Sequence, residues 1–556
     1  MRVLKWLGGV ASFVVVLAVV AWCNRIALIL LLARWQIPHI AANHPVVWNQ
    51  GPAVASVPVA KRPPNIVVIL ADDMGYNDIT VNGGGVADGA VPTPNIDSIA
   101  HQGVQFSNGY AGDATCAPSR AAIITGRYAT RFGFEFTPAP VAFARLIATM
   151  GKSVAHPPIF HQDVVENIPP LDNEAVPASE ITVASVLRKQ GYHTLHFGKW
   201  HLGGIAGRRP EDRGFDESLG FMPGASMYLP ESDVNVVNSR QAFDPIDLFL
   251  WAGLPWGVQF NGSPWFQPGG YMTDYLTDEA ISAVHANRNR PFFMYFAPNA
   301  VHTPLQATKA DYDALPNISD YRLRVYAAMV RDLDRNVGRL LKSLSDEGLA
   351  DNTMVIFTSD NGGANYIGLP DINRPFRGWK ATFFEGGMHV PYFIRWPAHI
   401  KPGSKYDAPV GHVDIFATAA AAAGAALPND RKMDGIDLTP FVTGQATGQP
   451  HKNLFWRSGH YRVVLAGGWK LQRLDVPAKQ WLFNLGSDPT EQHNLATSAR
   501  ILPLNHSWRT SLCDRRSTNP NELPRCLRCR VSMAHRRIQR WNNPTVRCWR
   551  YSRNRE

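Results

Sequence analysis

Short, uninterrupted apolar runs that alternate with helical patterns constrain the fold more than any other feature of this sequence. The run at 66–70, IVVIL, is wholly aliphatic, and similar runs lie at 192–198, 291–297 and 353–360. Such runs are typical of strands that are buried on both faces of a parallel sheet. Segments with helical periodicity separate them, such as YLTDEAISAVHA before 291–297. The alternation predicts an α/β fold, a large, doubly wound, mostly parallel sheet flanked by helices.

Other parts of the chain have different patterns. Residues 451–495 alternate short apolar stretches with Gly-containing turns, which is typical of an antiparallel meander. We therefore expect a main domain over 65–445 and a small C-terminal domain, built on an antiparallel sheet, over 446–500.

The N-terminus begins with an apolar segment. Residues 6–23 carry no charge and follow Arg2 and Lys5, and 18 apolar residues are enough to cross a bilayer. A cleaved signal peptide is the alternative, although no small-residue cleavage site follows the run. Residues 1–42 are thus interpreted as a transmembrane anchor or signal segment, and 43–64 as a Pro-rich linker. Either interpretation places the body outside the cytoplasm, in a periplasmic or secretory compartment.

The net charge of +10 comes entirely from the C-terminal tail, residues 501–556. The tail holds 13 Arg and 3 acidic residues, whereas the rest of the chain has 42 basic and 42 acidic residues. A neutral body with a basic tail does not indicate a nucleic-acid-binding domain. The tail also contains a C-x-x-C at 526–529 without the second ligand pair of a typical zinc site. We expect the tail to be irregular, and its composition would also fit a shifted reading frame.

Polar residues follow four of the predicted strands. They are Asp72 and Asp73, Lys199 and His201, His302, and Asp360 and Asn361. Ligands of such sheets bind beyond the carboxyl ends of the strands. The three carboxylates and the amide offer only oxygen atoms, which hard cations such as Ca²⁺ or Mg²⁺ prefer. A role in a turn could explain the polar residues after any one strand. It does not readily explain why four strands bring such residues to the same edge of the sheet.

A single cysteine, Cys116, stands at the predicted start of a helix. In CAPSR, Pro118 suits the first helical turn. Free N–H groups and the helix dipole stabilise negative charge there, and Arg120 lies one turn further on the same face. The other cysteines are Cys23 and four in the tail, so the body offers no disulfide partner. Core packing is the alternative to chemistry, and this setting favours a reactive thiol.

The segment CAPSRAAIITGR at 116–127 matches C-x-P-S-R followed by x₄-T-G-R, and it resembles the signature of type I sulfatases. ADDMGYND, GKWHLG, TSDNGG and RGWKATFFEGGMHVP appear in the order of that family. The chain is similar to the arylsulfatases, formylglycine-dependent enzymes of the alkaline phosphatase-like superfamily. The resemblance implies that the domain at 65–445 hydrolyses aryl or carbohydrate sulfate esters to alcohol and inorganic sulfate.

The same resemblance implies a modification and a metal. In the family, a formylglycine-generating maturase oxidises the signature cysteine, here Cys116, to Cα-formylglycine. A hydrated aldehyde can attack sulfur through one hydroxyl and expel sulfate after losing a proton from the other. The implied ligands of Ca²⁺ or Mg²⁺ are Asp72, Asp73, residue 116, Asp360 and Asn361.

The resemblance also assigns roles to the remaining site residues. Arg120 would stabilise the hydrated aldehyde, and His201 would assist deprotonation of its second hydroxyl. Lys199 and Lys380 would hold sulfate oxygens, and His302 would protonate the leaving oxygen. Lys199, His302 and Lys380 would thus contact the substrate.

Other functions remain open at this stage. Phosphonate or phosphate ester hydrolysis on the same fold is the alternative activity, and a membrane-anchored binding protein is the non-enzymatic alternative. The expected partners are a small-molecule or glycan sulfate ester, the maturase, and a membrane through the N-terminal segment. No nucleic acid is expected.

Overall fold

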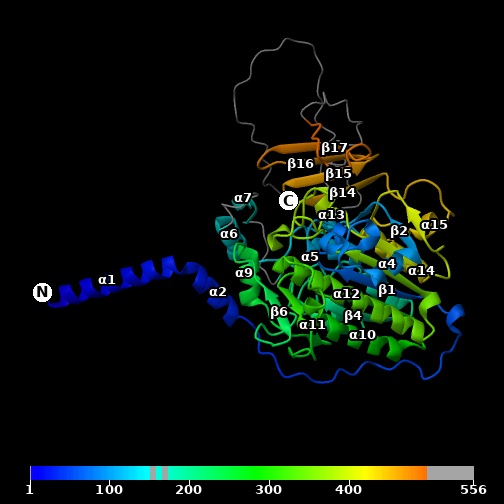
Figure 1. Cartoon of the computed structure of the whole chain (residues 1–556), viewed down its shortest axis with the longest axis horizontal. Coiled ribbons are helices and arrows are strands. Elements are labelled where there is room, and N and C mark those ends of the chain that lie inside the picture. The colour runs from blue at the N-terminus through cyan, green and yellow to red at the C-terminus, as the bar shows by residue number, and fades with distance from the viewer. Residues whose placement is uncertain (1, 151–157, 166–172, 497–556) are drawn as a thin grey trace, which may run out of the picture. The chain divides into compact units, whose positions relative to one another are not determined.

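A nine-stranded sheet forms the centre of the computed structural model, which describes residues 2–150, 158–165 and 173–496 (Figure 1). In spatial order the strands are β12 (Ser404–Tyr406), β2 (Val104–Phe106), β11 (Tyr392–Arg395), β10 (Thr353–Ser359), β1 (Asn65–Ala71), β8 (Phe292–Ala297), β4 (His193–Lys199), β5 (Glu217–Phe221) and β7 (Gln259–Phe260). The five strands from β10 to β5 are parallel, whereas β11 and β7 pair antiparallel with their inner neighbours. The predicted mostly parallel sheet is confirmed.

Helices cover both faces of this sheet. On one face lie α4 (Pro94–His101), α10 (Met272–Asn287) and α12 (Tyr321–Asp346), and on the other lie α5 (Cys116–Thr125), α8 (Val183–Lys189) and α14 (Val413–Ala422). Successive side chains of a strand point to opposite faces, so β1 contributes to both cores. Val67 and Ile69 pack with the first set of helices, and Val68 and Leu70 with the second. The sheet is therefore doubly wound, as predicted.

Smaller elements surround the sheet. They are α3 (Val86–Gly89), β3 (Gly109–Tyr110), α6 (Val141–Met150), α7 (Gln162–Val165), β6 (Val236–Ser239), α9 (Pro245–Gly253), β9 (Leu305–Thr308), α11 (Lys309–Asp313), α13 (Glu385–Met388), β13 (Val410–Gly411) and α15 (Thr439–Val442). β6 pairs antiparallel with β9, and β3 pairs parallel with β13.

The C-terminal strands form a separate antiparallel sheet. β14 (Asn453–Ser458), β15 (Tyr461–Ala466), β16 (Trp469–Leu474) and β17 (Lys479–Asn484) pair in sequence order, as the predicted meander requires (Figure 1). Trp456 of this sheet packs beside Tyr110 and Ala114, and its indole Nε1 donates a hydrogen bond to the carbonyl of Ala111 at 2.8 Å. The sheet therefore supports the loop that leads into α5. The Arg-rich tail and its C-x-x-C lie outside the described residues.

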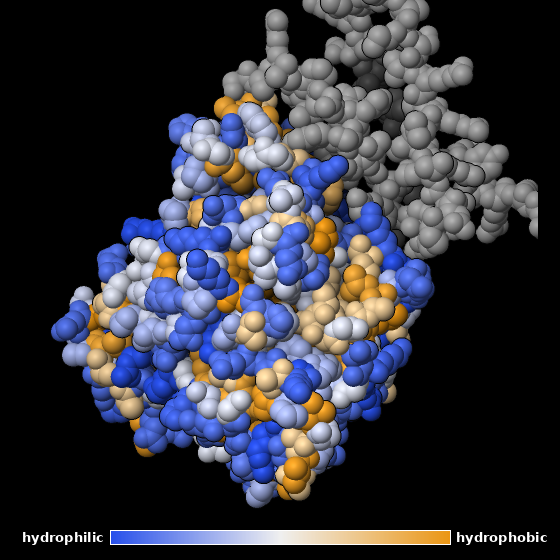
Figure 2. All heavy atoms as spheres, turned by 90° about the vertical axis from the view of Figure 1, so that its right-hand side faces the viewer, coloured by the Kyte–Doolittle hydropathy of each residue, from blue (hydrophilic) through white to orange (hydrophobic). Residues whose placement is uncertain are grey.

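The N-terminal helices differ from the body in their exposed residues. α1 (Arg2–Cys23) and α2 (Arg25–Trp35) expose many large apolar side chains, with Trp22 70% and Trp35 80% exposed. Figure 2 shows a face of the body on which hydrophilic and hydrophobic residues are interspersed instead. Among the described residues, no single helix has the length and apolar composition to cross a bilayer. Phe13–Cys23 and Arg25–Trp35 meet both requirements only as a pair, bent by 78°.

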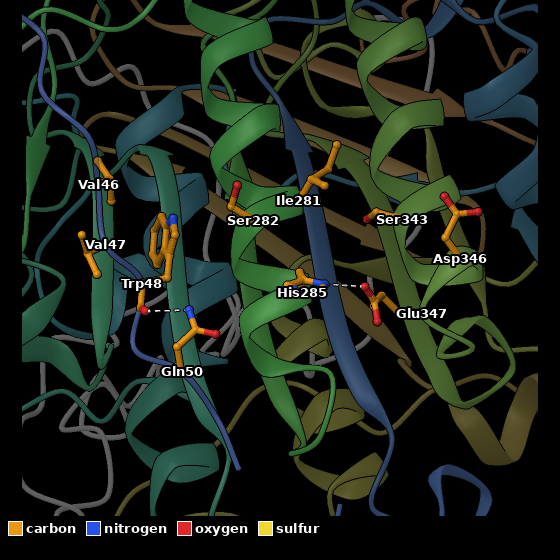
Figure 3. A pocket seen from close by; sticks show the side chains of 10 residues that line it. All are labelled: Val46, Val47, Trp48, Gln50, Ile281, Ser282, His285, Ser343, Asp346 and Glu347. Atoms are coloured by element: carbon orange, nitrogen blue, oxygen red, sulfur yellow. Dashed lines mark hydrogen bonds and ion pairs between the residues drawn. The ribbon is translucent and has the colours of Figure 1, made fainter. Parts of the chain in front are cut away.

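The predicted linker lies against the main domain. Trp48 is 4% exposed, and its indole nitrogen donates to Glu279 of α10 at 2.8 Å. Between this segment and helices α10 and α12 lies a pocket of about 530 Å³ (Figure 3). His285 and Glu347 meet across it, with Nδ1 and Oε1 2.7 Å apart. The pocket is lined by none of the predicted site residues, so it lies outside the predicted site.

A buried ion cluster joins the C-terminal sheet to the main domain. The ammonium of Lys470 on β16 lies 2.6 Å from a carboxylate oxygen of Glu385 and 3.1 Å from one of Glu491, and all three side chains are at most 2% exposed. Burial opposes ionisation of Glu385, but Lys470 and His389 outweigh it and lower its pKa to about 2. The backbone N–H of Glu385 also donates to Glu491 at 2.6 Å. Removing Lys470 would take away the one ammonium group that pairs with both Glu385 and Glu491.

We expect Lys470→Met to lower the free energy of unfolding by about 3–5 kcal/mol, because an unpaired buried charge is strongly destabilising. Chemical denaturation followed by tryptophan fluorescence measures this change. Lys479→Met is the matched control, since Lys479 is exposed on the neighbouring strand β17, and it should stay within about 0.5 kcal/mol of the wild type. Equal effects of the two substitutions would contradict the assigned role of Lys470.

Candidate functional site

The carboxyl ends of four neighbouring strands converge on one buried cluster of polar side chains. β1 runs into Asp72 and Asp73, β4 ends at Lys199, β8 leads to His302, and β10 runs into Asp360 and Asn361. These six residues are at most 5% exposed. Parallel strands place their carboxyl ends at one edge of a sheet, which explains why residues far apart in the sequence meet here.

Two cations surround Asp72. The Lys199 ammonium lies 2.9 and 2.7 Å from the two carboxylate oxygens of Asp72. Arg120 of α5 reaches the same carboxylate at 3.5 Å and that of Asp360 at 2.8 Å, and it donates to the Lys199 carbonyl at 3.0 Å. Burial, reinforced by Asp360, nevertheless raises the pKa of Asp72 to about 7. The carboxylates are thus only partly neutralised by the side chains around them.

Asp73 has a different set of partners. Lys380 lies 2.8 Å from its carboxylate, Asn361 Nδ2 donates to it at 2.7 Å, and His302 Nε2 lies 3.5 Å away. Burial alone would raise the pKa of Asp73, but Lys380 and His302 outweigh it and hold this pKa well below its usual range. Asp73 has a φ of 57°, a conformation that non-glycine residues seldom adopt outside functional sites.

Cys116 begins α5 and points into the cluster. Its Sγ lies 3.9 Å from an oxygen of Asp72 and 4.0 Å from one of Asp73, and the residue is 2% exposed. Every residue of α5 is buried, and the helix ends at Gly126 in the left-handed conformation. The helix N-terminus therefore presents this thiol to two carboxylates at the sheet edge.

His201 follows β4 and lies beside the cations of the cluster. Burial, together with Lys199 and Arg120, lowers the pKa of His201 well below its usual value, so its imidazole is neutral at pH 7. Its Nδ1 is buried without a hydrogen-bond partner among the described residues. The close approach of β4 and β8 just before this turn depends on Gly198, where a Cβ would lie 2.1 Å from the Ala297 carbonyl oxygen. The neutral imidazole therefore has one buried ring nitrogen that is available for a hydrogen bond.

His302 has a defined tautomer. Its Nδ1 bonds to the carbonyl oxygen of Thr303, and because a carbonyl can only accept, Nδ1 carries the hydrogen. Nε2 then faces the cluster, 3.2 Å from the Lys380 ammonium. The structure thus brings all ten residues singled out from the sequence to one site.

Comparisons with known proteins agree with this geometry. A family model described as Sulfatase matches residues 64–425. The chain belongs to the sulfatase family. A second model, described as N-sulphoglucosamine sulphohydrolase, C-terminal, matches residues 377–518 of this sulfatase. The resemblance seen in the signature segment is confirmed, and the enzyme is a sulfuric ester hydrolase.

Relatives of this sulfatase include enzymes with different substrates in their names. N-acetylgalactosamine-6-sulfatase of Mus musculus is 33% identical, over 74% of this chain and 72% of the relative. Steryl-sulfatase of Mus musculus is 32% identical, over 71% of this chain and 68% of the relative. The crystal structure of Ps i-CgsB in complex with k-i-k-neocarrahexaose shares 32% identity with a TM-score of 0.64, covering 79% of this chain and 89% of that one.

Members of this family generally use a divalent cation, and the residues of this sulfatase fit one. Asn361 Oδ1 is buried without a hydrogen-bond partner among the described residues, and such an atom is costly unless a ligand satisfies it. It belongs to the same cluster as the carboxylates of Asp72, Asp73 and Asp360. This donor set consists of hard oxygen atoms, which Ca²⁺ and Mg²⁺ prefer.

The structure adds residues that the sequence analysis missed. Tyr366 places its hydroxyl 3.3 Å from Asp73 and 3.4 Å from the Lys380 ammonium. Tyr228 donates to the carbonyl oxygens of Asn299 and His302, at 2.6 and 2.9 Å. Tyr366 lies only five positions after Asn361, so its closeness to the carboxyl end of β10 was a signal in the sequence. Tyr228 carried no comparable signal, because it approaches the site from a distant loop.

Proposed function

We propose that this sulfatase hydrolyses carbohydrate sulfate esters through a formylglycine at position 116. The observation that carries the proposal is the Cys116 side chain at the start of α5, facing Asp72 and Asp73 with two lysines bound to the same carboxylates. Oxidised to formylglycine and hydrated, residue 116 would supply an oxygen nucleophile for sulfur and a second hydroxyl whose deprotonation releases sulfate.

The cations of the cluster bind and orient the sulfate group. Lys199 pairs with Asp72, and Lys380 pairs with Asp73. Their ammonium groups can hold sulfate oxygens and offset the charge that builds up in the transition state. Arg120 is fixed by Asp360 and by the Lys199 carbonyl, so it is a rigid donor next to residue 116.

The two histidines move protons in opposite directions. His201 is neutral, because burial and the neighbouring cations lower its pKa, and it serves as the base for a hydroxyl on residue 116. His302 presents Nε2 to the cluster between Lys380 and Asp73. With a second proton on Nε2, His302 is the acid that protonates the leaving oxygen.

We propose Ca²⁺ as the cation, held by Asp72, Asp73, Asp360, Asn361 and residue 116. When bound, it would neutralise the carboxylates and orient the sulfate group. Mg²⁺ has the same ligand preference but demands a stricter octahedral geometry. Ca²⁺ tolerates the irregular arrangement of ligands that come from three segments of the chain.

The sugar preference rests on two relatives of the chain. One is named N-acetylgalactosamine-6-sulfatase, and the other is a solved structure in complex with k-i-k-neocarrahexaose. We expect the enzyme, co-expressed with a maturase, to release sulfate from sulfated oligosaccharides at higher kcat/KM than from steryl sulfate or from phosphonate and phosphate esters. Ion chromatography of released sulfate and phosphate measures this. Preference for the phosphorus esters would overturn the proposed function.

Active protein should carry formylglycine at position 116. The peptide that contains this residue is then about 18 Da lighter than its cysteine form, because –CH₂SH is replaced by –CHO. Peptide mass spectrometry of the purified enzyme measures the difference. Full activity with an unmodified cysteine would contradict the proposed nucleophile.

Asp360→Ala should remove cation binding and activity together. The substitution deletes a ligand and also the carboxylate that fixes Arg120, so the thermal unfolding midpoint should fall as well. Dialysis of the wild type against a chelator should abolish activity, and added Ca²⁺ should restore it. Full turnover after exhaustive chelation, with the metal content checked by mass spectrometry, is the result that excludes a catalytic cation.

His302→Ala should affect poor leaving groups most. Nitrophenolate leaves readily as an anion, whereas a sugar alkoxide needs a proton, so the loss in kcat/KM should be larger on carbohydrate sulfates by about 10²–10⁴-fold. Lys199→Ala is the comparison. It removes charge stabilisation of the sulfate group, so it should lower kcat/KM by about the same factor on nitrophenyl sulfate and on carbohydrate sulfates. Measurement of kcat/KM across a leaving-group series separates the two roles. If His302→Ala lowered kcat/KM by the same factor for every leaving group, another residue would be the proton donor, and Lys380 would be the next candidate.

A further inference from the structure

A second cluster of metal-binding side chains lies outside the catalytic site. His161 directly precedes α7, Asp163 lies within it, and His460 occupies the turn between β14 and β15. One ligand atom of each of the three side chains lies within 4.8 Å of the others. His460 Nε2 is 3.0 Å from a carboxylate oxygen of Asp163, and the two imidazole centroids are 5.0 Å apart.

The arrangement goes beyond an ion pair. A single histidine would suffice to pair with Asp163, but a second imidazole is packed beside the first, tilted by 34°. Among the described residues, this ring contact is the one interaction that His161 makes. Two imidazole nitrogens and a carboxylate oxygen form a donor set that suits zinc, whereas Ca²⁺ and Mg²⁺ prefer oxygen alone.

The distances suit a small tetrahedral ion. Zinc bonds of about 2.0–2.2 Å place neighbouring ligand atoms roughly 3.3 Å apart in a tetrahedron. The three ligand atoms lie within 4.8 Å of one another, so they would have to move closer by at most about 1.5 Å to reach this spacing. The Asp163 side chain is 63% exposed and that of His460 is 27% exposed, so a water molecule can take the fourth position.

We propose that His161, Asp163 and His460 form a zinc site, separate from the catalytic cation, that fixes residues 158–165 to the β14–β15 turn. That turn is already attached to the main domain. The guanidinium of Arg457 pairs with the Glu135 carboxylate, with Nε at 3.0 and 3.1 Å from its oxygens, and Gly459 N–H donates to it at 3.1 Å. Zinc therefore connects a segment between α6 and α8 to a fixed point of the C-terminal sheet.

Titration calorimetry of the full chain with Zn²⁺, in excess Ca²⁺, tests the site. His460→Ala and His161→Ala should each lose one bound equivalent, or bind it at least ten-fold more weakly than the wild type. His493→Ala is the matched control, because His493 is exposed and faces Asp488 at 3.7 Å without a third ligand; it should bind zinc like the wild type. The catalytic cluster and the tail cysteines are present in all four proteins, so any zinc they bind cancels in the comparison.

Replacing zinc by Co²⁺ gives an independent readout. A four-coordinate Co²⁺ at this site should absorb strongly in the visible range, so both site variants should absorb less than the wild type by the contribution of one ion, and His493→Ala should match the wild type. Because His161 and His460 belong to different segments, failure of one variant to fold leaves the other as the test. Zinc binding and Co²⁺ spectra that are the same in all four proteins would overturn the proposal, as would the absence of zinc binding by the wild type.

Discussion

The burial of three carboxylates at the ends of two neighbouring strands is the constraint on which the rest of this structure depends. Asp72, Asp73 and Asp360 are at most 4% exposed, and charges so placed are costly unless cations lie among them. The protein supplies those cations from separate elements, with Arg120 on α5 and Lys199 at the end of β4. Each cation thereby ties its own segment to the edge of the sheet. The geometry of the buried cluster and the tertiary structure are thus held by the same set of charges.

The strands and the place where the polar side chains gather were predictable because both are encoded locally. A buried strand such as β1 needs a continuous apolar run, and the next residues of the chain, Asp72 and Asp73, must then lie at the sheet edge. Cys116 was predictable for a similar reason, since Pro118 and Gly126 mark the two ends of a short helix. Resemblance to a known family added the roles of individual residues, which spacing alone could not assign.

Contacts between distant parts of the chain were not predictable. The 43–64 segment has the composition of a linker, yet Trp48 is buried against α10 through a bond to a residue 231 positions away. Lys470 lies in a segment that alternates polar and apolar residues, so the sequence suggests an exposed lysine on a strand. No nearby residue indicates that its partners are Glu385 and Glu491. Tyr228 reaches the site only because its loop folds over the strand ends. The spacing of apolar residues predicts the helix or strand to which a residue belongs. The burial and partners of Trp48, Lys470 and Tyr228 depend instead on other elements that pack against theirs.

The ion cluster around Lys470 also has a consequence for the order in which the chain is made. Glu385 precedes Lys470 by 85 residues, so a ribosome releases the acid well before the base that neutralises it. A nascent or truncated chain that ends before β16 contains Glu385 and its neighbour His389 but lacks Lys470. The main domain therefore reaches full stability only after the C-terminal sheet has been translated.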